Sequence, residues 1–500
     1  MPSLLIEKFF LKHFSIMPTE KNRFSHFNHF FNPRSLALIG ASANPNKWGF
    51  RILVNLLAGD FQGQVFPVNP KGGSLFGLDV YSSITALPDG VDLAVITIPA
   101  QQVAQVLHAL ADRGIRSVIV ITSGFSETGP EGVAHEKEIS RIARKRGLKF
   151  VGPNTMGIFS AGPRLHALMP PIQPLPGGVS YVSQSGNLGV QMLGWGGERG
   201  VGFSKFVSSG NEGDLQCEDY IEYFASDPET KLILGYIEGL EDGRRFLEIA
   251  GKATREKPFI IFKGGRTDAG GKAARSHSGA LAGHYSIYNA AFRQAGIVEA
   301  ETSDSLLDYA AAFLHHPLPR GNRIIILTRG GGWGVVGADA CREWGLNLAP
   351  LSDRVIQKIN RVLPPYWSHG NPIDMAATLN REAFPACLEA LIQEKEVDGI
   401  IALGVEFGKR TTVLADRLRG MNLLEGIDLE TEPEEFRDIR LTLDLMEAYR
   451  KPVIMVSGVN SYTKAVLEKG RTAVLFSTPE RAVRAMARLW EYSRYLQKLN

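Results

Sequence analysis

Cysteine is scarce in this sequence. Three cysteines occur among 500 residues, Cys217, Cys341 and Cys387, and no two of them form a CxxC pair. This spacing argues against a disulfide framework and against a zinc site held by cysteines, and it is typical of proteins in a reducing compartment. We therefore expect a cytoplasmic protein that carries no metal site on this chain.

Long apolar runs and an excess of one charge are also missing. No apolar stretch reaches the ~18 residues that a membrane-spanning helix needs. Lysine and arginine together number 55, against 52 aspartates and glutamates, so the net charge is only +3. Because there is no polybasic tract either, the sequence predicts neither a nucleic-acid partner nor a membrane partner.

The N-terminal segment, residues 1–30, lacks the pattern of a secretory signal. It is rich in phenylalanine, histidine and lysine, and no compact apolar core precedes a small-residue cleavage site. We expect this extension to be loosely ordered.

Glycine, by contrast, is abundant, with 53 residues. Many of these glycines end short apolar runs that alternate with helix-like segments, an arrangement that predicts parallel sheets built from βαβ units. A chain of this length is too long for a single core. We predict an α/β protein with three successive units, at residues 31–152, 153–316 and 320–492. The expected strands include 35–40, 64–69, 92–98, 116–123, 177–186, 231–239, 258–265, 323–330, 398–405 and 451–458.

The first loop that follows a predicted strand runs from Gly40 through Ser42 to Gly49. It is not a GxGxxG fingerprint, which disfavours NAD or FAD, but a nucleotide-like ligand still fits. Lys47 lies on this loop, and Lys71 lies on the loop after the next strand. Each lysine taken alone is a typical solvated surface residue. Two lysines at one sheet edge are better explained by a polyphosphate ligand.

The second unit contains a strand that ends in Gln-Ser-Gly immediately before a helix. Ser183, Ser185 and Gly186 therefore place hydroxyl groups and backbone N–H groups at a helix start, which is an anion site. The alternative is an ordinary serine N-cap. Glu238 closes a later strand at the edge where α/β proteins bind ligands, so it is either a functional carboxylate or the start of a solvated turn.

A flexible cationic stretch, residues 263–283, carries a single histidine, His277, in the run Ser-His-Ser-Gly. A helix-like segment follows at 286–294. An imidazole on such a loop can carry a phosphoryl group, and a carboxylate such as Glu238 would fix its tautomer and stabilise its cation. The alternative is an ordinary surface histidine on a glycine-rich turn.

A set of short motifs makes a resemblance specific, although each motif alone is weak. In chain order they are GASANPNKWG, VNPKGG, TSGFSETG, GPNTMG, SQSGNLG, SSGNEGD, YIEG, RSHSGALAG, TRGGGWGV and NPIDM. With these motifs the chain resembles the NDP-forming acyl-CoA synthetases over residues 30–492. It looks most like the alpha subunits of ADP-forming acetate–CoA ligase, which are relatives of succinyl-CoA synthetase.

This resemblance implies a Rossmann-like CoA-binding domain followed by two flavodoxin-like, doubly wound ligase domains. It implies that His277 is phosphorylated, that Glu238 orients it, and that Ser185 and Gly186 hold the phosphate. It also implies CoA contacts from the first unit, at Gly40, Ser42, Lys47, Gly49, Lys71, Thr122 and Ser123. The implied reaction interconverts acyl-CoA, ADP and phosphate with acid, ATP and CoA.

Two departures qualify the resemblance. Many relatives have cysteine in the GPNC turn, where this chain has Thr155. Nothing after Asn322 reads as the ATP-grasp nucleotide domain, which implies that a separate beta subunit binds ADP or ATP with Mg²⁺ in a hetero-oligomer. A related ligase for another acyl group or for GDP remains open. So does an inactive CoA-binding sensor or scaffold.

Overall fold

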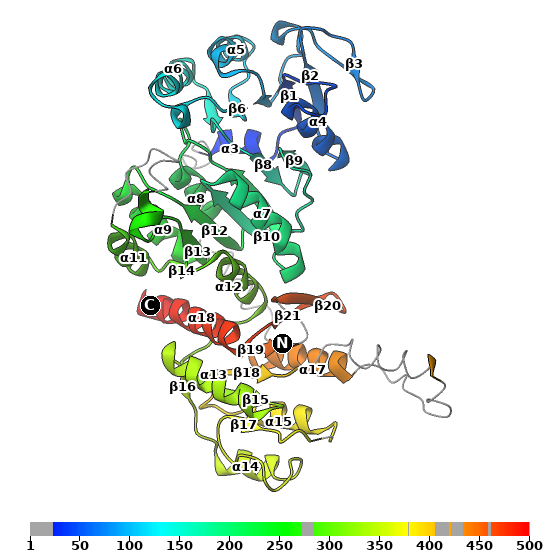
Figure 1. Ribbon diagram of the computed structural model, residues 1–500, viewed down its shortest axis with the longest axis vertical. Helices are drawn as coiled ribbons and strands as arrows, with labels where there is room; N and C mark the ends of the chain where they lie inside the picture. Colours follow the sequence, from blue (N-terminus) through cyan, green and yellow to red (C-terminus); the bar gives the residue numbers. More distant parts are fainter. Residues whose placement is uncertain are drawn as a thin grey trace, which may run out of the picture.

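The computed structural model describes residues 24–272, 284–378, 380–405, 420–421, 434–458 and 462–499. Three large sheets follow one another along the long axis of the molecule, each flanked by helices (Figure 1). The α/β class and the parallel sheets predicted from the sequence are confirmed. His277 lies outside the described residues.

The first sheet is entirely parallel, with the order β2-β1-β5-β6-β7. Its strands are β1 (Ser35–Ile39), β2 (Gln64–Val68), β5 (Leu93–Ile96), β6 (Ser117–Val120) and β7 (Lys149–Val151). The central strands are buried along their whole length, because helices cover both faces, and this explains their continuous apolar sequence. The other elements are α4 (Trp48–Ala58), α5 (Ala100–Asp112), α6 (Pro130–Arg146), the hairpin β3 (Ser74–Leu75) and β4 (Leu78–Asp79), and the 3-10 turns Ile84–Ala86 and Ser126–Thr128.

The second sheet has the order β14-β13-β12-β10-β11-β8-β9. Its strands are β8 (Gly157–Ser160), β9 (Leu165–Leu168), β10 (Pro176–Ser183), β11 (Phe203–Ser208), β12 (Leu232–Ile237), β13 (Phe259–Lys263) and β14 (Val298–Ala300). Its helices are α7 (Gly186–Gly196), the 3-10 turn Gly197–Arg199, α8 (Cys217–Ser226), α9 (Gly243–Glu256), α11 (Tyr285–Gln294) and α12 (Ser303–His315). The antiparallel hairpin β8–β9, which the sequence did not predict, extends one edge toward the first sheet.

The third sheet has the order β16-β15-β18-β19-β21-β20, and β17 pairs with β15. Its strands are β15 (Arg323–Thr328), β16 (Asn347–Leu348), β17 (Ile373–Asp374), β18 (Gly399–Leu403), β19 (Val453–Val456), β20 (Lys464–Glu468) and β21 (Arg471–Phe476). Its helices are α13 (Gly331–Glu343), α14 (Asp353–Ile359), α15 (Ala383–Ile392), α17 (Glu434–Tyr449) and α18 (Pro479–Leu499). Only the edge strand β20 runs antiparallel to its neighbour within this sheet as described.

Helix α3 (Ser25–Phe31) lies at the junction of the first and second sheets (Figure 1). Phe27, Phe30 and Phe31 are buried, and the Phe27 ring stacks on Tyr223 of α8 with 4.6 Å between ring centroids. The expectation of a loosely ordered segment at 1–30 is therefore wrong for residues 25–30, because their phenylalanines fill a groove beside α8. Residues 1–23 lie outside the described part of the chain.

Helices α12 and α18 join the second and third sheets. One continuous hydrophobic cluster runs from Tyr181 of β10 through α12 and α18 to Ile326 of β15. Arg481 of α18 donates two hydrogen bonds to Asp308 of α12, at 2.6 and 2.9 Å. Figure 1 shows α18 between the two sheets. The C-terminal helix thus packs on the second unit as well as on its own sheet.

Candidate active site

A cavity of about 1320 Å³ opens between the carboxyl ends of strands in the first and second sheets. Its lining brings together eight residues that the sequence singled out: Gly40, Ser42, Lys47, Thr122, Ser123, Ser185, Gly186 and Glu238. Three others, Gly49, Lys71 and Ser183, do not line it. Parallel strands end at the same edge of a sheet, so loops far apart in sequence meet here.

The loop after β1 is held by close backbone packing. Gly40 has a φ of +95°, which favours glycine, and a Cβ on Gly49 would collide with the Gly40 carbonyl oxygen. Gly49 therefore allows α4 to start directly against the loop. Lys71 is exposed on a neighbouring loop, where its backbone N–H donates to Asn69 Oδ1 at 3.0 Å.

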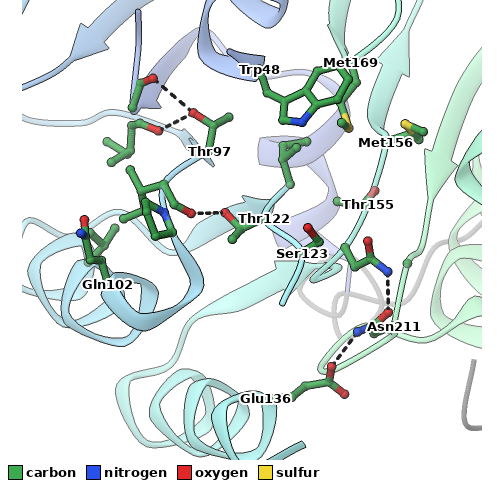
Figure 2. A pocket seen from close by; sticks show the side chains of 18 of the residues that line it. Trp48, Thr97, Gln102, Thr122, Ser123, Glu136, Thr155, Met156, Met169 and Asn211 are labelled. Atoms are coloured by element: carbon green, nitrogen blue, oxygen red, sulfur yellow. Dashed lines mark hydrogen bonds between the residues drawn. The ribbon is translucent and has the colours of Figure 1, made fainter. Parts of the chain in front are cut away.

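The loop after β6 carries Thr122 and Ser123 and is tied to the second unit. Asn211 Nδ2 donates to Glu127 Oε2 at 2.7 Å. It also donates to Glu136 Oε2 at 2.8 Å (Figure 2). Burial raises the pKa of Glu127, but hydrogen bonds from Asn211 and from backbone amides, including that of Gly124, outweigh burial and leave this pKa below its ordinary value. The carboxylate therefore stays ionised and holds the loop.

Helix α7 begins at Gly186 on the opposite wall of the cavity. The N-cap Ser185 makes no side-chain capping bond, so the first N–H groups of the helix have no partner within the helix. This is the geometry of an anion site. Ser183, predicted to bind phosphate directly, is fully buried, and its hydroxyl donates to the Ser185 carbonyl at 2.7 Å. Ser183 therefore stabilises the turn between β10 and α7 from the buried side.

Glu238 follows β12 and is held from several sides. Its backbone N–H donates to Gln184 Oε1 at 2.6 Å, and the Tyr236 hydroxyl donates to its Oε1 at 3.3 Å. Lys263 Nζ donates to the Glu238 carbonyl at 2.7 Å, and burial lowers the pKa of Lys263 to about 8. Because Ile237 pairs with Lys263 in the sheet, β13 ends beside Glu238.

Glu212 is a cavity residue that the sequence reasoning missed. Ser209 Oγ donates to its Oε1 at 2.6 Å, and Gln184 Nε2 donates to its Oε2 at 3.2 Å. Burial raises the pKa of Glu212 to about 8, so the carboxyl group holds its proton at neutral pH. Its backbone lies in the left-handed region, with a φ of +57°. The position of Glu212 in the loop after β11 was a signal that could have identified it.

Three family models match the chain. A CoA binding domain matches residues 34–161, a succinyl-CoA ligase like flavodoxin domain matches 176–313, and a ligase-CoA domain matches 324–409. The alpha subunit of acetate–CoA ligase (ADP-forming) I from Pyrococcus furiosus is 35% identical over 474 residues, which cover 94% of this chain and 98% of the relative. The chain belongs to the family of ADP-forming acetate–CoA ligase alpha subunits.

Other relatives agree with this ligase family. The alpha subunit of the P. furiosus isoenzyme II is 42% identical over 76% of this chain and 82% of its own length. A solved structure titled dinucleotide forming acetyl-coenzyme A synthetase 1 of Ca. Korarchaeum cryptofilum, in complex with phosphate and ADP, superposes with a TM-score of 0.82 at 35% identity. It covers 95% of this chain and 98% of the solved chain. The predicted family, acid–thiol ligase class and domain types are therefore confirmed.

Thr155 lies in the turn of this ligase where many relatives have the cysteine of the GPNC motif. Its hydroxyl donates to the Ser208 carbonyl and accepts from the Gly157 N–H at 3.0 Å. Threonine is therefore fully bonded in this turn. Across the described ranges, no helix is long and apolar enough to cross a membrane, and no three His, Cys, Asp or Glu side chains cluster as metal ligands would.

Proposed function

We propose that this chain is the alpha subunit of an NDP-forming acyl-CoA synthetase. It would interconvert acyl-CoA, ADP and phosphate with a small carboxylic acid, ATP and CoA, through an acyl phosphate and a phosphohistidine at His277. The observation that carries the proposal is the cavity at the junction of the first and second sheets. It joins the Gly40–Lys47 loop of the first sheet to the start of α7 and to Glu238 of the second.

The chemistry divides into three displacements. A phosphate oxygen attacks the thioester carbonyl carbon, the C–S bond breaks, and CoA leaves as the thiol after taking the proton of hydrogen phosphate. A nitrogen of His277 then attacks the phosphorus of the acyl phosphate, and the P–O bond to the acyl group breaks, releasing the carboxylate. ADP finally takes the phosphoryl group from the histidine. Two easier transfers thereby replace one difficult transfer.

The described residues support each role. In this proposal the CoA nucleotide lies along Gly40, Ser42, Lys47, Thr122 and Ser123, and Lys47 faces its phosphates. The N–H groups at the start of α7 offset the phosphoryl charge without reorganising. Glu238, fixed through Gln184 and Lys263, would orient the imidazole and stabilise the cation that forms on transfer.

The nucleotide step is assigned to a separate beta subunit with an ATP-grasp domain, which would bind ADP or ATP with Mg²⁺. Support comes from the two P. furiosus relatives, which are named as alpha subunits. The three family models that match the chain are a CoA binding domain, a flavodoxin domain and a ligase-CoA domain, and none of these three is an ATP-grasp domain. We therefore propose a hetero-oligomer in the cytoplasm.

Incubation with acetyl-CoA and radiolabelled phosphate, without any partner, tests the proposal. We expect acid-labile, base-stable label on the protein, and its loss in His277→Ala. His284→Ala is the matched control, because His284 is exposed just beyond the same segment, and it should keep the label. Label that survives in His277→Ala would refute the assignment. Binding of CoA without any label would favour the CoA-sensor alternative.

A further inference from the structure

A methionine lies against the start of α7. A Cβ placed on Gly186 would come within 3.1 Å of Met156 Cβ, and still closer to Met156 Cγ. The Met156 side chain therefore contacts the backbone at the proposed phosphate site. Any group attached to a phosphate bound there must lie beside this thioether side chain.

A second methionine is paired with the first. The Met169 N–H donates to the Met156 carbonyl at 3.1 Å, which continues the antiparallel hairpin β8–β9 by one residue on each strand. Residues opposite each other in an antiparallel pair project on the same face, and both methionines line the cavity. Figure 2 shows Met156 and Met169 on the same wall.

Trp48 extends this wall. Asn55 of α4 donates to the carbonyl groups of Leu168 and Pro170, at 2.6 and 3.0 Å, and so fixes the helix beside Met169. Trp48 precedes Asn55 by seven residues and therefore shares its helix face. Its side chain lines the cavity and is 44% exposed, so it presents apolar ring surface to the cavity.

The cavity lining beside this wall offers no counter-charge to a second carboxylate on the acyl group, and Arg51, whose guanidinium lies 5.0 Å from the Trp48 ring centroid, does not line the cavity. Thr155 directly precedes Met156, and its hydroxyl is already hydrogen-bonded to two backbone groups, the Ser208 carbonyl and the Gly157 N–H. The ionisable side chains that line the cavity on the second-unit side, as far as the structure describes them, are the acids Glu212, Glu238 and Glu241. Lys47 is the one cation among the described lining residues, and the proposed function assigns it to CoA.

We infer that Met156, Met169 and Trp48 form the acyl subsite of this cavity, and that it selects monocarboxylic acids with an apolar chain longer than that of acetate. The inference rests on the proposed function, because the position of the phosphate defines where the acyl group lies. Thioether side chains are flexible and polarizable, so the subsite accommodates chains of varied shape. A dicarboxylic acyl group would bury its second carboxylate against apolar atoms, at a large cost.

Three substrates, acetyl-CoA, butyryl-CoA and succinyl-CoA, test the subsite in the complete enzyme with its partner. Butyryl-CoA has two methylene groups more than acetyl-CoA, and burying each in the subsite is worth about 0.8 kcal/mol. We therefore expect kcat/KM to be roughly 15-fold higher for butyryl-CoA than for acetyl-CoA. Succinyl-CoA, which matches butyryl-CoA in length, should be at least ten-fold poorer than butyryl-CoA. Met156→Gln conserves length but adds polarity, and we expect it to remove most of the butyryl preference.

Two controls keep the outcomes separate. Met156→Leu should retain the preference, and Met421→Gln, at an exposed methionine outside the cavity lining, should leave all three values unchanged. If acetyl-CoA and phosphate label the wild-type chain but butyryl-CoA shows no advantage, the subsite inference is wrong and the proposed function stands. If no acyl-CoA gives label, the proposed function itself is wrong. An unchanged preference in Met156→Gln would also overturn the subsite.

Discussion

At the scale of single residues, Glu212, which is half-buried, and Lys263, which is buried, are ionisable groups whose pKa values shift in opposite directions. Desolvation raises the pKa of Glu212 to about 8 and lowers that of Lys263 to about 8. Glu212 accepts a hydrogen bond from Gln184, which binds the Glu238 N–H, and Lys263 donates to the Glu238 carbonyl itself. Perturbed pKa values of this kind concentrate at functional sites.

The pH dependence of stability tests the environment of Glu212. In the unfolded chain this carboxyl loses its proton near pH 4.5, whereas in the folded chain it keeps the proton up to about pH 8. The contribution of Glu212 to stability is therefore complete below pH 4.5 and is lost as the pH rises to about 8. Urea titrations at pH 5, 7 and 8.5 should show this decline in wild type and a flatter dependence in Glu212→Gln. Equal slopes would show that Glu212 titrates normally.

Gln184 is a positioning residue in this account. Its amide accepts from the N–H groups of Glu238 and Gly239 and donates to Glu212 and to the Gly239 carbonyl. Gln184→Met keeps the length and removes these bonds, so Glu238 should lose its position. We expect the rate of phosphohistidine formation to fall by about 10- to 100-fold, which is 1.4 to 2.7 kcal/mol of activation free energy.

The measurement for Gln184→Met is single-turnover labelling at saturating acyl-CoA, together with the KM for acyl-CoA. The KM should change little, because the residue acts through Glu238. Gln191→Met, at an exposed glutamine of helix α7, which begins two residues after Gln184, is the matched control and should label at the wild-type rate. A large rise in KM with an unchanged labelling rate would contradict the positioning role.

At the scale of elements, helix α3 illustrates packing that a local reading of the sequence does not reveal. Phe27 is buried between α8 and the neighbouring phenylalanines, with Tyr220 edge-on at 5.8 Å. Replacing a buried phenylalanine by alanine removes apolar contacts and leaves a cavity. We expect Phe27→Ala to lower the free energy of unfolding by about 3 to 5 kcal/mol in urea titrations.

Phe76→Ala is the control for this prediction, because Phe76 is 56% exposed on the first unit. It should change the free energy of unfolding by less than about 1 kcal/mol. If Phe27→Ala were equally mild, α3 would contribute little to the junction. Its three buried phenylalanines would then be dispensable for folding.

Long apolar strands and the glycine loops that follow them were predictable from sequence, whereas short edge elements were not. β1, β5, β12, β15 and β19 are continuous apolar runs bounded by loops, so their pattern is unambiguous. The hairpin β8–β9 has two strands of four residues whose burial depends on contact with α4 and β11. Helix α12 was also not predicted, although Thr302 at its start accepts a capping hydrogen bond from the Ser305 N–H.

The candidate site was predictable where a residue ends a strand or begins a helix, and not elsewhere. Glu238 directly follows β12, Ser185 is the N-cap of α7 and Gly186 begins that helix, and all three line the cavity. Gln184, Glu212 and the two methionines act through neighbours that are distant in sequence, so only the folded chain brings them together. Ser183 and Gly49 were assigned to ligand contact, but they support the turns behind it.

At the scale of the whole molecule, the cavity belongs to the junction between two sheets, and no single unit forms it. One hydrophobic cluster crosses from α3 and β1 to β12, and another crosses from β10 to β18. These shared clusters tie the CoA-binding unit to the ligase unit, and the ligase unit to the third sheet. We propose that this chain carries out the acyl and phosphate steps and that a partner carries out the nucleotide step.

The release of free CoA thiol most directly tests this division of labour. The purified chain is given excess acetyl-CoA and phosphate, without ADP or partner. It should release a burst of CoA thiol and then stop. The amount of thiol should not exceed one equivalent per chain, for the phosphohistidine formed, plus the small amount of acyl phosphate present at equilibrium. Addition of ADP with the ATP-grasp subunit should then restart release in step with ATP formation. Continuous thiol release without ADP, or ATP formation by the chain alone, would contradict the account.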